Sequence, residues 1–183
     1  INTKTTDWSF IVSLILIAPR RTLIVACILC ILIPIWAVAA AERPTITISS
    51  LDISLQLKEF YLSGDTWAID PWEKGIGHLE QTGWFDTGSN IVLAGHSVMP
   101  NGKPGVFASL NTVAVGQEII LFDGIGDRYY QITDIRVVPV DDVSVTMPTE
   151  YERLTLITCD ISSYDEASQG YTQRLVVIAD RIS

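Results

Sequence analysis

Basic residues are scarce in most of this chain of 183 residues. Residues 42–183 hold nine Lys and Arg against twenty Asp and Glu, a net charge of −11, whereas residues 1–41 hold three against one, a net of +2. Because binding to a phosphate backbone relies on clustered Lys and Arg, the acidic part is not expected to bind nucleic acid. Internal repeats and low-complexity segments are also absent, and the length suits one domain plus an appendage.

Cysteine is almost as rare. Cys27 and Cys30 lie one helical turn apart in an apolar run, where they act as ordinary packing residues, and Cys159 is the only thiol in residues 42–183. No disulfide can form within that part. In an exported domain a lone cysteine indicates intermolecular pairing or a reactive role, and the alternative is a small buried apolar residue.

Charge is absent from residues 22–41, which read "TLIVACILCILIPIWAVAAA". As a helix rising ~1.5 Å per residue, this run would cover a hydrocarbon core ~30 Å thick. Arg20 and Arg21 directly precede it, and such basic flanks stay on the cytoplasmic side. We therefore expect a membrane protein with a cytoplasmic, interfacial segment at 1–21, a single-pass transmembrane signal anchor at 22–41, and an extracytoplasmic domain at 42–183.

Other interpretations of the N-terminal part remain open. The run could be a buried core helix, or it could pair with the shorter apolar piece at 8–18 as a helical hairpin. Residues 37–42, "AVAAAE", could be cleaved by signal peptidase, but secretory apolar cores are usually only ~7–15 residues long. An uncleaved anchor is favoured, and the natural start is expected to lie upstream of Ile1.

Residues 42–183 read as β-structure. Short runs rich in branched and aromatic residues alternate with turn formers, as in an antiparallel barrel or sandwich. The clearest hairpin surrounds "DGIGD" at 123–127. The nearly continuous apolar runs at 90–94 and 174–179 predict strands in the middle of the barrel, and 105–113 is the best candidate for a short helix. The predicted strands start at Thr45, Ser54, Asn90, Gln117, Arg128, Arg153 and Gln173.

Cys159 ends one predicted strand, "RLTLITC", and needs partners if it is a nucleophile. A thiol is only slightly ionised at neutral pH, and a neighbouring cation favours the attacking thiolate. His96 closes the apolar run "IVLAGH" and would also emerge at a strand end, which makes it the preferred base. His78, in the glycine-rich "GIGHLEQTG", has no predicted strand to fix it and is the weaker candidate.

Attack on a carbonyl also creates an oxyanion, which needs a donor or positive charge worth ~3–4 kcal/mol. Arg174 opens the last apolar strand, and an antiparallel return would bring its guanidinium beside the thiol. Asp160 would raise the pKa of the thiol if it faced the site. Adjacent strand residues point to opposite faces, which is expected to keep this charge outside.

The chain closely resembles the sortases, membrane-anchored cysteine transpeptidases of bacterial surfaces. The resemblance lies in four features in this order: "NIVLAGH", "GVFASL", "RLTLITC" and an arginine that opens the final strand. The resemblance covers residues 44–182. It implies an eight-stranded β-barrel with short helices, a catalytic set of His96, Cys159 and Arg174, and a supporting role for Thr158. No cofactor or metal is implied.

The resemblance also implies the reaction. The cysteine would cleave an LPxTG-like sorting motif of a secreted protein through a thioester, and an amine from a peptidoglycan precursor or a pilin-like lysine would resolve it. The pattern is nearest to class D, E or F sortases, since the chain ends at 183 without the second membrane segment of the pilin type. The "DPW" at 70–72 lies within the domain, so no lid over the cysteine is expected.

The acidic residues at 140–152 indicate a solvated loop. They do not indicate a calcium site, which would need ~6–8 oxygen ligands. This loop and residues 161–171 are expected to set specificity. Two rival functions stay open: a membrane-tethered cysteine peptidase that hydrolyses its thioester, and a non-catalytic, membrane-anchored binding barrel in which Cys159 is merely buried.

Overall fold

The computed structural model describes residues 42–183. The predicted cytoplasmic segment at 1–21 and the predicted anchor at 22–41 lie outside the described residues. Within 42–183, no helix is long and apolar enough to cross a membrane.

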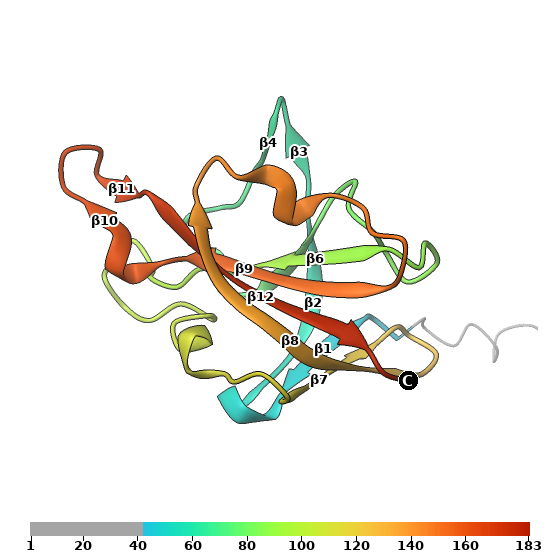
Figure 1. The fold of residues 1–183 in the computed structure, drawn as a ribbon. Coiled ribbons are helices and arrows are strands. Elements are labelled where there is room, and N and C mark those ends of the chain that lie inside the picture. The colour runs from blue at the N-terminus through green and yellow to red at the C-terminus, as the bar shows by residue number, and fades with distance from the viewer. Residues whose placement is uncertain (1–41) are drawn as a thin grey trace, which may run out of the picture. The chain divides into compact units, whose positions relative to one another are not determined.

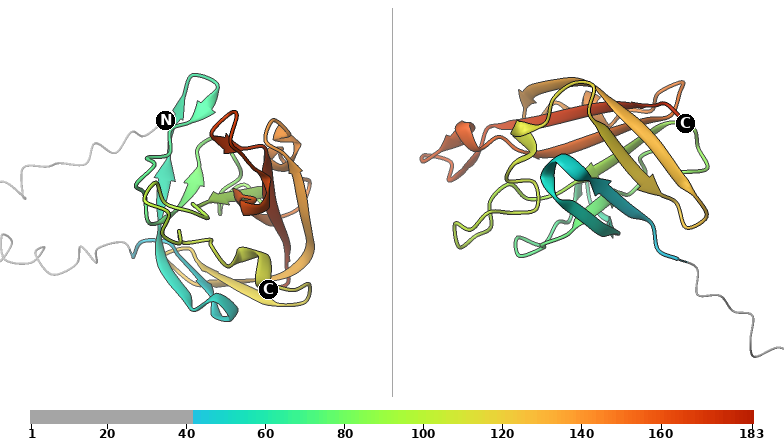
Figure 2. Two further views of the ribbon diagram at one scale, coloured as in Figure 1. Left: turned by 90° about the vertical axis from the view of Figure 1, so that its left-hand side faces the viewer. Right: turned by 90° about the horizontal axis from the view of Figure 1, so that it is seen from below.

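Eight strands close into a barrel in the order β1-β2-β5-β6-β9-β12-β8-β7 (Figure 1). The two views in Figure 2 show these strands wrapping around a single interior. The predicted all-β, eight-stranded barrel with short helices is thereby confirmed. The barrel strands are β1 (Thr45–Ile48), β2 (Ile53–Phe60), β5 (Ile76–Leu79), β6 (Asn90–Ala94), β7 (Glu118–Phe122), β8 (Asp127–Pro139), β9 (Arg153–Cys159) and β12 (Gln173–Arg181).

Two small hairpins project from the barrel (Figure 1): β3 (Leu62–Ser63) with β4 (Thr66–Trp67), and β10 (Tyr164–Asp165) with β11 (Gly170–Tyr171). The described helices are single 3₁₀ turns, η1 (Ser49–Leu51), η2 (Leu110–Thr112), η3 (Val143–Thr146) and η4 (Ile161–Ser163). The expected helix over 105–113 is therefore reduced to η2. Its first residues instead bond to the chain around His96, through Gly105 N–H to the Ser97 carbonyl and Phe107 N–H to the His96 carbonyl.

The barrel is mixed, whereas the sequence pattern predicts an antiparallel one. β2 pairs in parallel with β5, and β6 pairs in parallel with β9. A parallel pair needs a crossover connection instead of a tight turn. The β3–β4 hairpin lies in the first crossover, and β7 and β8 lie in the second. The hairpin predicted at 123–127 is confirmed, since β7 and β8 are antiparallel across it and Gly124 has a φ of 96°.

Apolar side chains cover both faces of the central strands. Ile91 and Leu93 of β6 belong to the barrel interior, whereas Val92 and Ala94 pack outside it with Phe60 and other residues of a second cluster. A third cluster lies outside β12 and β8, where Val145 of η3 contributes. Burial on both faces is why 90–94 and 174–179 are nearly uninterrupted apolar runs.

A network of charges lies at the start of β9, at the other end of the strand from Cys159. The Glu152 carboxylate accepts hydrogen bonds from Arg128 at 2.9 Å, from Arg181 at 2.8 Å and from the Tyr130 hydroxyl at 2.5 Å. Burial raises the pKa of Glu152, but the bonds from Tyr130, Arg128 and Arg181 outweigh it and lower the pKa from its ordinary value of 4.5. The ionised carboxylate therefore stabilises the fold.

Replacing Glu152 with Gln is expected to lower the free energy of unfolding by about 2–3 kcal/mol at pH 7, because two cations and a buried hydroxyl lose a charged acceptor. A carboxyl whose pKa is lowered on folding stabilises the protein above its unfolded pKa, and this is lost as the pH falls. The difference between the two proteins should therefore shrink below pH 4.5. Urea unfolding at pH 7 and below pH 4.5 measures the difference in the free energy of unfolding. Glu150→Gln, at an exposed neighbouring position, is the control.

Candidate active site

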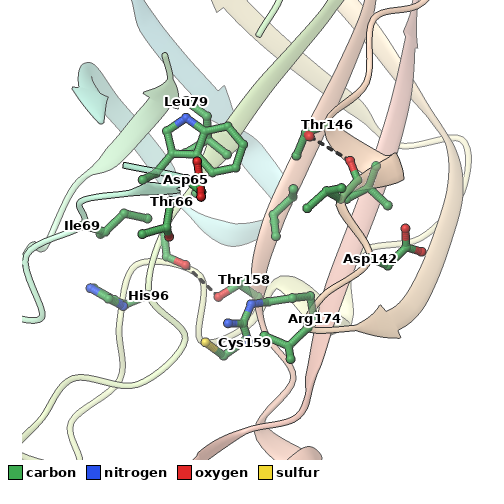
Figure 3. A pocket seen from close by; sticks show the side chains of 17 residues that line it. Asp65, Thr66, Ile69, Leu79, His96, Asp142, Thr146, Thr158, Cys159 and Arg174 are labelled. Atoms are coloured by element: carbon green, nitrogen blue, oxygen red, sulfur yellow. Dashed lines mark hydrogen bonds between the residues drawn. The ribbon is translucent and has the colours of Figure 1, made fainter. Parts of the chain in front are cut away.

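Cys159 is the last residue of β9, and Arg174 is the second residue of β12. The two are paired directly across these antiparallel strands. Directly opposite residues in a ladder point to the same face, so the guanidinium and the thiol share one side of the sheet. In Figure 3 the Arg174 guanidinium lies next to the sulfur. The antiparallel return predicted from the sequence is confirmed.

The charge of Arg174 is not neutralised by a carboxylate of residues 42–183. Its Nη1 atom donates only long hydrogen bonds, to the Tyr171 carbonyl at 3.4 Å and the Gln173 carbonyl at 3.3 Å. The ion pairs of this part of the chain are made by other cations. A guanidinium held so loosely is available to a negative charge that develops nearby.

Burial raises the pKa of the Cys159 thiol from its ordinary value of 9.0, and the positive charge of Arg174 opposes this without overcoming it. The thiol is therefore neutral at pH 7 in this structure. The sequence leads to the opposite expectation, that nearby cations make the sulfur a thiolate. The difference arises from desolvation, which disfavours the charged form and depends on how much chain covers the group.

His96 lies two residues after β6, in a segment held on both sides. Gly95 N–H donates to the Ile157 carbonyl of β9 at 3.2 Å, and the His96 carbonyl accepts from Phe107 N–H. Gly105 packs so closely that a Cβ there would lie 2.2 Å from the His96 carbonyl oxygen. This packing fixes the backbone from which the imidazole projects.

The His96 ring does not bond to the thiol. Its Nε2–H donates to the backbone carbonyl of Asp70 at 2.9 Å, and no hydrogen bond joins it to Cys159 within residues 42–183. Nδ1 is then the nitrogen that can accept a proton. Catalytic hydrogen bonds are often incomplete without substrate, so this arrangement is compatible with a role as acid and base.

A cavity of about 340 Å³ brings the three predicted residues together, because His96, Cys159 and Arg174 all line it (Figure 3). One wall comes from the crossover that contains β3 and β4, and another from the connection between β8 and β9 that contains η3. The first wall was not foreseen, since no cover over Cys159 is predicted from the "DPW" stretch. The second wall lies in the loop at 140–152 that is predicted to set specificity. These walls include Asp65, Thr66, Trp67, Ile69, Val140, Asp142, Val143, Val145 and Thr146.

Thr158 is buried and links the two segments that carry the cysteine and the histidine. Its hydroxyl donates to the Gly95 carbonyl at 2.8 Å, the residue before His96 (Figure 3). A hydroxyl already committed to a carbonyl is suited to fixing the distance between β6 and β9. The contact fits the supporting role expected for this threonine.

His78 lies elsewhere and is not a loop residue, so the expectation from the sequence is wrong. It is buried on β5, where Nδ1 bonds to the Glu59 carboxylate at 2.8 Å and Nε2 to the Gly83 carbonyl at 2.9 Å. It does not line the cavity of Cys159. The strand was missed because its glycines suggested a loop. Gly77 in fact makes room for the Phe60 ring, which would lie 2.6 Å from a Cβ at that position.

Tyr171 is a neighbour that the sequence did not identify. Burial, and then the nearby Cys159 and Tyr164, raise the pKa of Tyr171, so its hydroxyl stays protonated. Its ring packs edge to face with Tyr164 at 5.3 Å and stiffens the β10–β11 hairpin beside the site. Two tyrosines on either side of a turn do not indicate, from the sequence, that one of them lies beside the cysteine.

Replacing Arg174 with Ala is expected to raise the pKa of the thiol further, because the one opposing charge is removed. Alkylation of Cys159 at pH 8 should slow by about threefold to tenfold, since a pKa shift of one unit changes the thiolate fraction tenfold. Iodoacetamide labelling followed by mass spectrometry measures the rate. Arg136→Ala, an exposed arginine of β8, is the control, and an unchanged rate in the Arg174 variant would contradict the assigned contact.

The protein is thus a closed, mixed β-barrel in which a cysteine, a histidine and an arginine line one cavity. A family model described as the Sortase domain matches residues 46–182, and the chain belongs to the sortase family of cysteine transpeptidases. It is 33% identical over 96 residues to sortase D of Bacillus subtilis, a match that covers 52% of this chain and 46% of that protein. It is 30% identical over 113 residues to sortase A of Staphylococcus aureus, covering 60% of this chain and 52% of that one. The chain thus spans about half the length of these curated relatives.

Solved structures agree on the fold. A Clostridium perfringens sortase D5 transpeptidase superposes with a TM-score of 0.61 at 23% identity, over 77% of this chain and 79% of that one. Sortase A from Corynebacterium diphtheriae superposes with a TM-score of 0.58 at 27% identity, over 79% of this chain and 63% of that one. Relatives of both the D and A types match, so these matches do not assign a class.

Proposed function

We propose that this chain is a sortase-type transpeptidase that cleaves an LPxTG-like sorting motif in secreted proteins and transfers the acyl group to an amine of the cell wall or of another surface protein. The observation that carries the proposal is the pairing of Cys159 with Arg174 across β9 and β12, in a cavity that His96 also lines. A membrane anchor at 22–41, with the barrel outside the cell, would place the enzyme where such substrates meet. That location rests on the sequence pattern alone.

The first half of the reaction is acylation. The Cys159 sulfur bonds to the carbonyl carbon of the scissile peptide bond, its thiol proton passes to His96, and Arg174 stabilises the oxyanion. His96 then returns the proton to the departing amine as the C–N bond breaks. Because the resting thiol is neutral, attack requires proton transfer from sulfur together with the bond to carbon.

The second half is aminolysis of the thioester. An incoming neutral amine forms a C–N bond to the acyl carbon and loses a proton to His96, and the sulfur leaves and recovers a proton as the C–S bond breaks. Since the His96 ring now donates to the Asp70 carbonyl, either Nδ1 performs these transfers or the contact opens when substrate binds. The crossover that contains Asp70 also lines the cavity. A ligand in the cavity can therefore move this crossover and open its contact with His96.

Purified protein incubated with an LPxTG peptide and triglycine tests the proposal. The expected product is the ligated peptide, together with a thioester on Cys159 visible by mass spectrometry. Cleavage without ligation would favour the membrane-tethered cysteine peptidase. The absence of both thioester and cleavage, tested with several sorting-motif variants, would favour a binding barrel.

A further inference from the structure

One wall of the Cys159 cavity is formed by η3, through Val143, Val145 and Thr146. In Figure 3, Thr146 and Ile69 lie on opposite sides of this cavity, so the wall bounds the space that a peptide would enter. A single helical turn is too short to be stable by itself. The position of the wall therefore depends on the contacts that η3 makes with the barrel.

Asn90, the first residue of β6, supplies polar contacts of this kind without lining the cavity itself. It is 2% exposed, and its Nδ2 donates to the Val145 and Met147 carbonyls, each at 3.0 Å. Its Oδ1 accepts from the Thr155 hydroxyl of β9 at 2.7 Å. The orientation of the amide is thereby fixed, because a reversed amide would turn its oxygen toward two carbonyl oxygens.

The middle of the connection between β8 and β9 has few other ties. Near its end, Thr149 N–H donates to the Ser89 hydroxyl at 2.9 Å. For residues 143–148, the two bonds from Asn90 are the only hydrogen bonds to parts of the described chain outside this connection. Val145 also packs in the third apolar cluster, but apolar contact is non-directional. The Asn90 amide therefore specifies where the wall lies.

The same network joins the wall to the strands that carry the reacting groups. Asn90 begins β6, which leads to His96, and Thr155 lies on β9, which ends at Cys159. Asn90 lies at the opposite end of β6 from His96. Its loss is therefore expected to change the wall and to leave the surroundings of the sulfur as they are.

We propose that Asn90 is a positioning residue for peptide binding, which acts through η3 to set the shape of the cavity that takes the sorting motif. Thr155 is its partner and orients the amide. This inference rests on the proposed function. The peptide lies against the wall, whereas the bonds change at Cys159, so loss of the Asn90 contacts weakens peptide binding and leaves the reaction of the bound peptide nearly unchanged.

Asn90→Asp tests the inference. An aspartate has the same shape and can accept from Thr155, but its carboxylate has no N–H to donate and would face two carbonyl oxygens. The full chain, purified in detergent, is supplied with increasing LPxTG peptide, and the single-turnover rate of thioester formation is measured. The half-saturating peptide concentration is expected to rise about fivefold to tenfold, and the rate at saturation to change by less than about twofold.

Thr155→Val is the second variant, and it tests the inference even where an aspartate at position 90 prevents folding. Valine keeps the β-branched shape and removes only the hydroxyl that orients the amide. It should raise the half-saturating concentration by about twofold to fivefold, again with little change at saturation. Asn101→Asp, at an exposed position outside the cavity, makes the same chemical change as Asn90→Asp and should alter neither quantity.

Hydrogen exchange adds a measurement that separates positioning from a general loss of stability. Amides of residues 143–148 should exchange faster in both variants, while those of the barrel strands keep their protection. Faster exchange throughout the barrel, without a selective effect on 143–148, would contradict the positioning role.

The outcomes separate the two claims. If the unmodified chain forms no thioester, the proposed function is overturned and this inference with it. If the unmodified chain forms the thioester and both variants saturate at the same peptide concentration as it does, the inference alone is overturned. A lower rate at saturation with an unchanged half-saturating concentration would also overturn it, since Asn90 would then affect the chemistry and not the binding of peptide.

Discussion

Replacing Cys159 with Ala is expected to abolish ligation and to lower the rate of peptide cleavage by at least about 10⁴-fold. Removal of a nucleophile eliminates the covalent route and leaves only what binding and oxyanion stabilisation provide. No thioester should be visible by mass spectrometry, and peptide turnover followed by chromatography measures the rate. The fold should survive, because a half-buried thiol held neutral by its surroundings is close to a small apolar residue.

Cys159→Ser provides the matched control for shape. A serine hydroxyl fits the same space but stays protonated, so this variant should be nearly as inactive as the Ala variant while unfolding at a similar temperature. Persistent cleavage in both variants would show that another group attacks the substrate. The assignment of the site, and not only the chemistry, would then be wrong.

Replacing His96 with Ala is expected to lower the rate of acylation by about 10²–10⁴-fold, the usual contribution of a positioned acid and base. The Ala variant also loses the hydrogen bond to the Asp70 carbonyl, so a change in the nearby crossover could contribute. His96→Gln separates the two effects. A glutamine amide can donate to the same carbonyl but cannot transfer a proton.

If His96 is the acid and base, the Gln variant should be almost as slow as the Ala variant. A Gln variant with near-normal activity would instead assign His96 to holding the crossover. Single-turnover kinetics of peptide cleavage across pH 5–9 distinguish these results. His78→Gln is a useful contrast, since that buried side chain bonds to Glu59 and Gly83 and its replacement should lower the melting temperature without changing the rate of cleavage.

The raised pKa of the thiol changes how its reactivity is interpreted. By itself, a thiol no more reactive than in the unfolded chain would suggest a non-catalytic binding barrel. In the structure, a slow thiol is what burial imposes even on a nucleophile, because desolvation disfavours the thiolate. Dependence of the alkylation rate on Arg174, and formation of a thioester with peptide, are therefore the better discriminators between an enzyme and a binding module.

Local patterns were sufficient for most of the barrel strands and for the nucleophile. Alternation and β-branched content depend only on neighbouring residues, and Cys159 stands out because no other thiol occurs in residues 42–183. The pairing of Cys159 with Arg174 could also be predicted, since strands that follow one another in the sequence are usually neighbours in the sheet. β5 was not predicted, because its one glycine, Gly77, serves a contact with Phe60 from another strand.

The sequence by itself determined an acidic barrel domain, its family resemblance, and His96, Cys159 and Arg174 as candidates for one site. Tertiary structure alone decided the parallel pairs, the bond from His96 to the Asp70 carbonyl, the neutral state of the thiol and the unpartnered Ser97 hydroxyl. The physical reason is that strand propensity is local, whereas desolvation and hydrogen-bond satisfaction depend on which distant segments cover a group. A short stretch of sequence does not show which distant segments will cover its side chains.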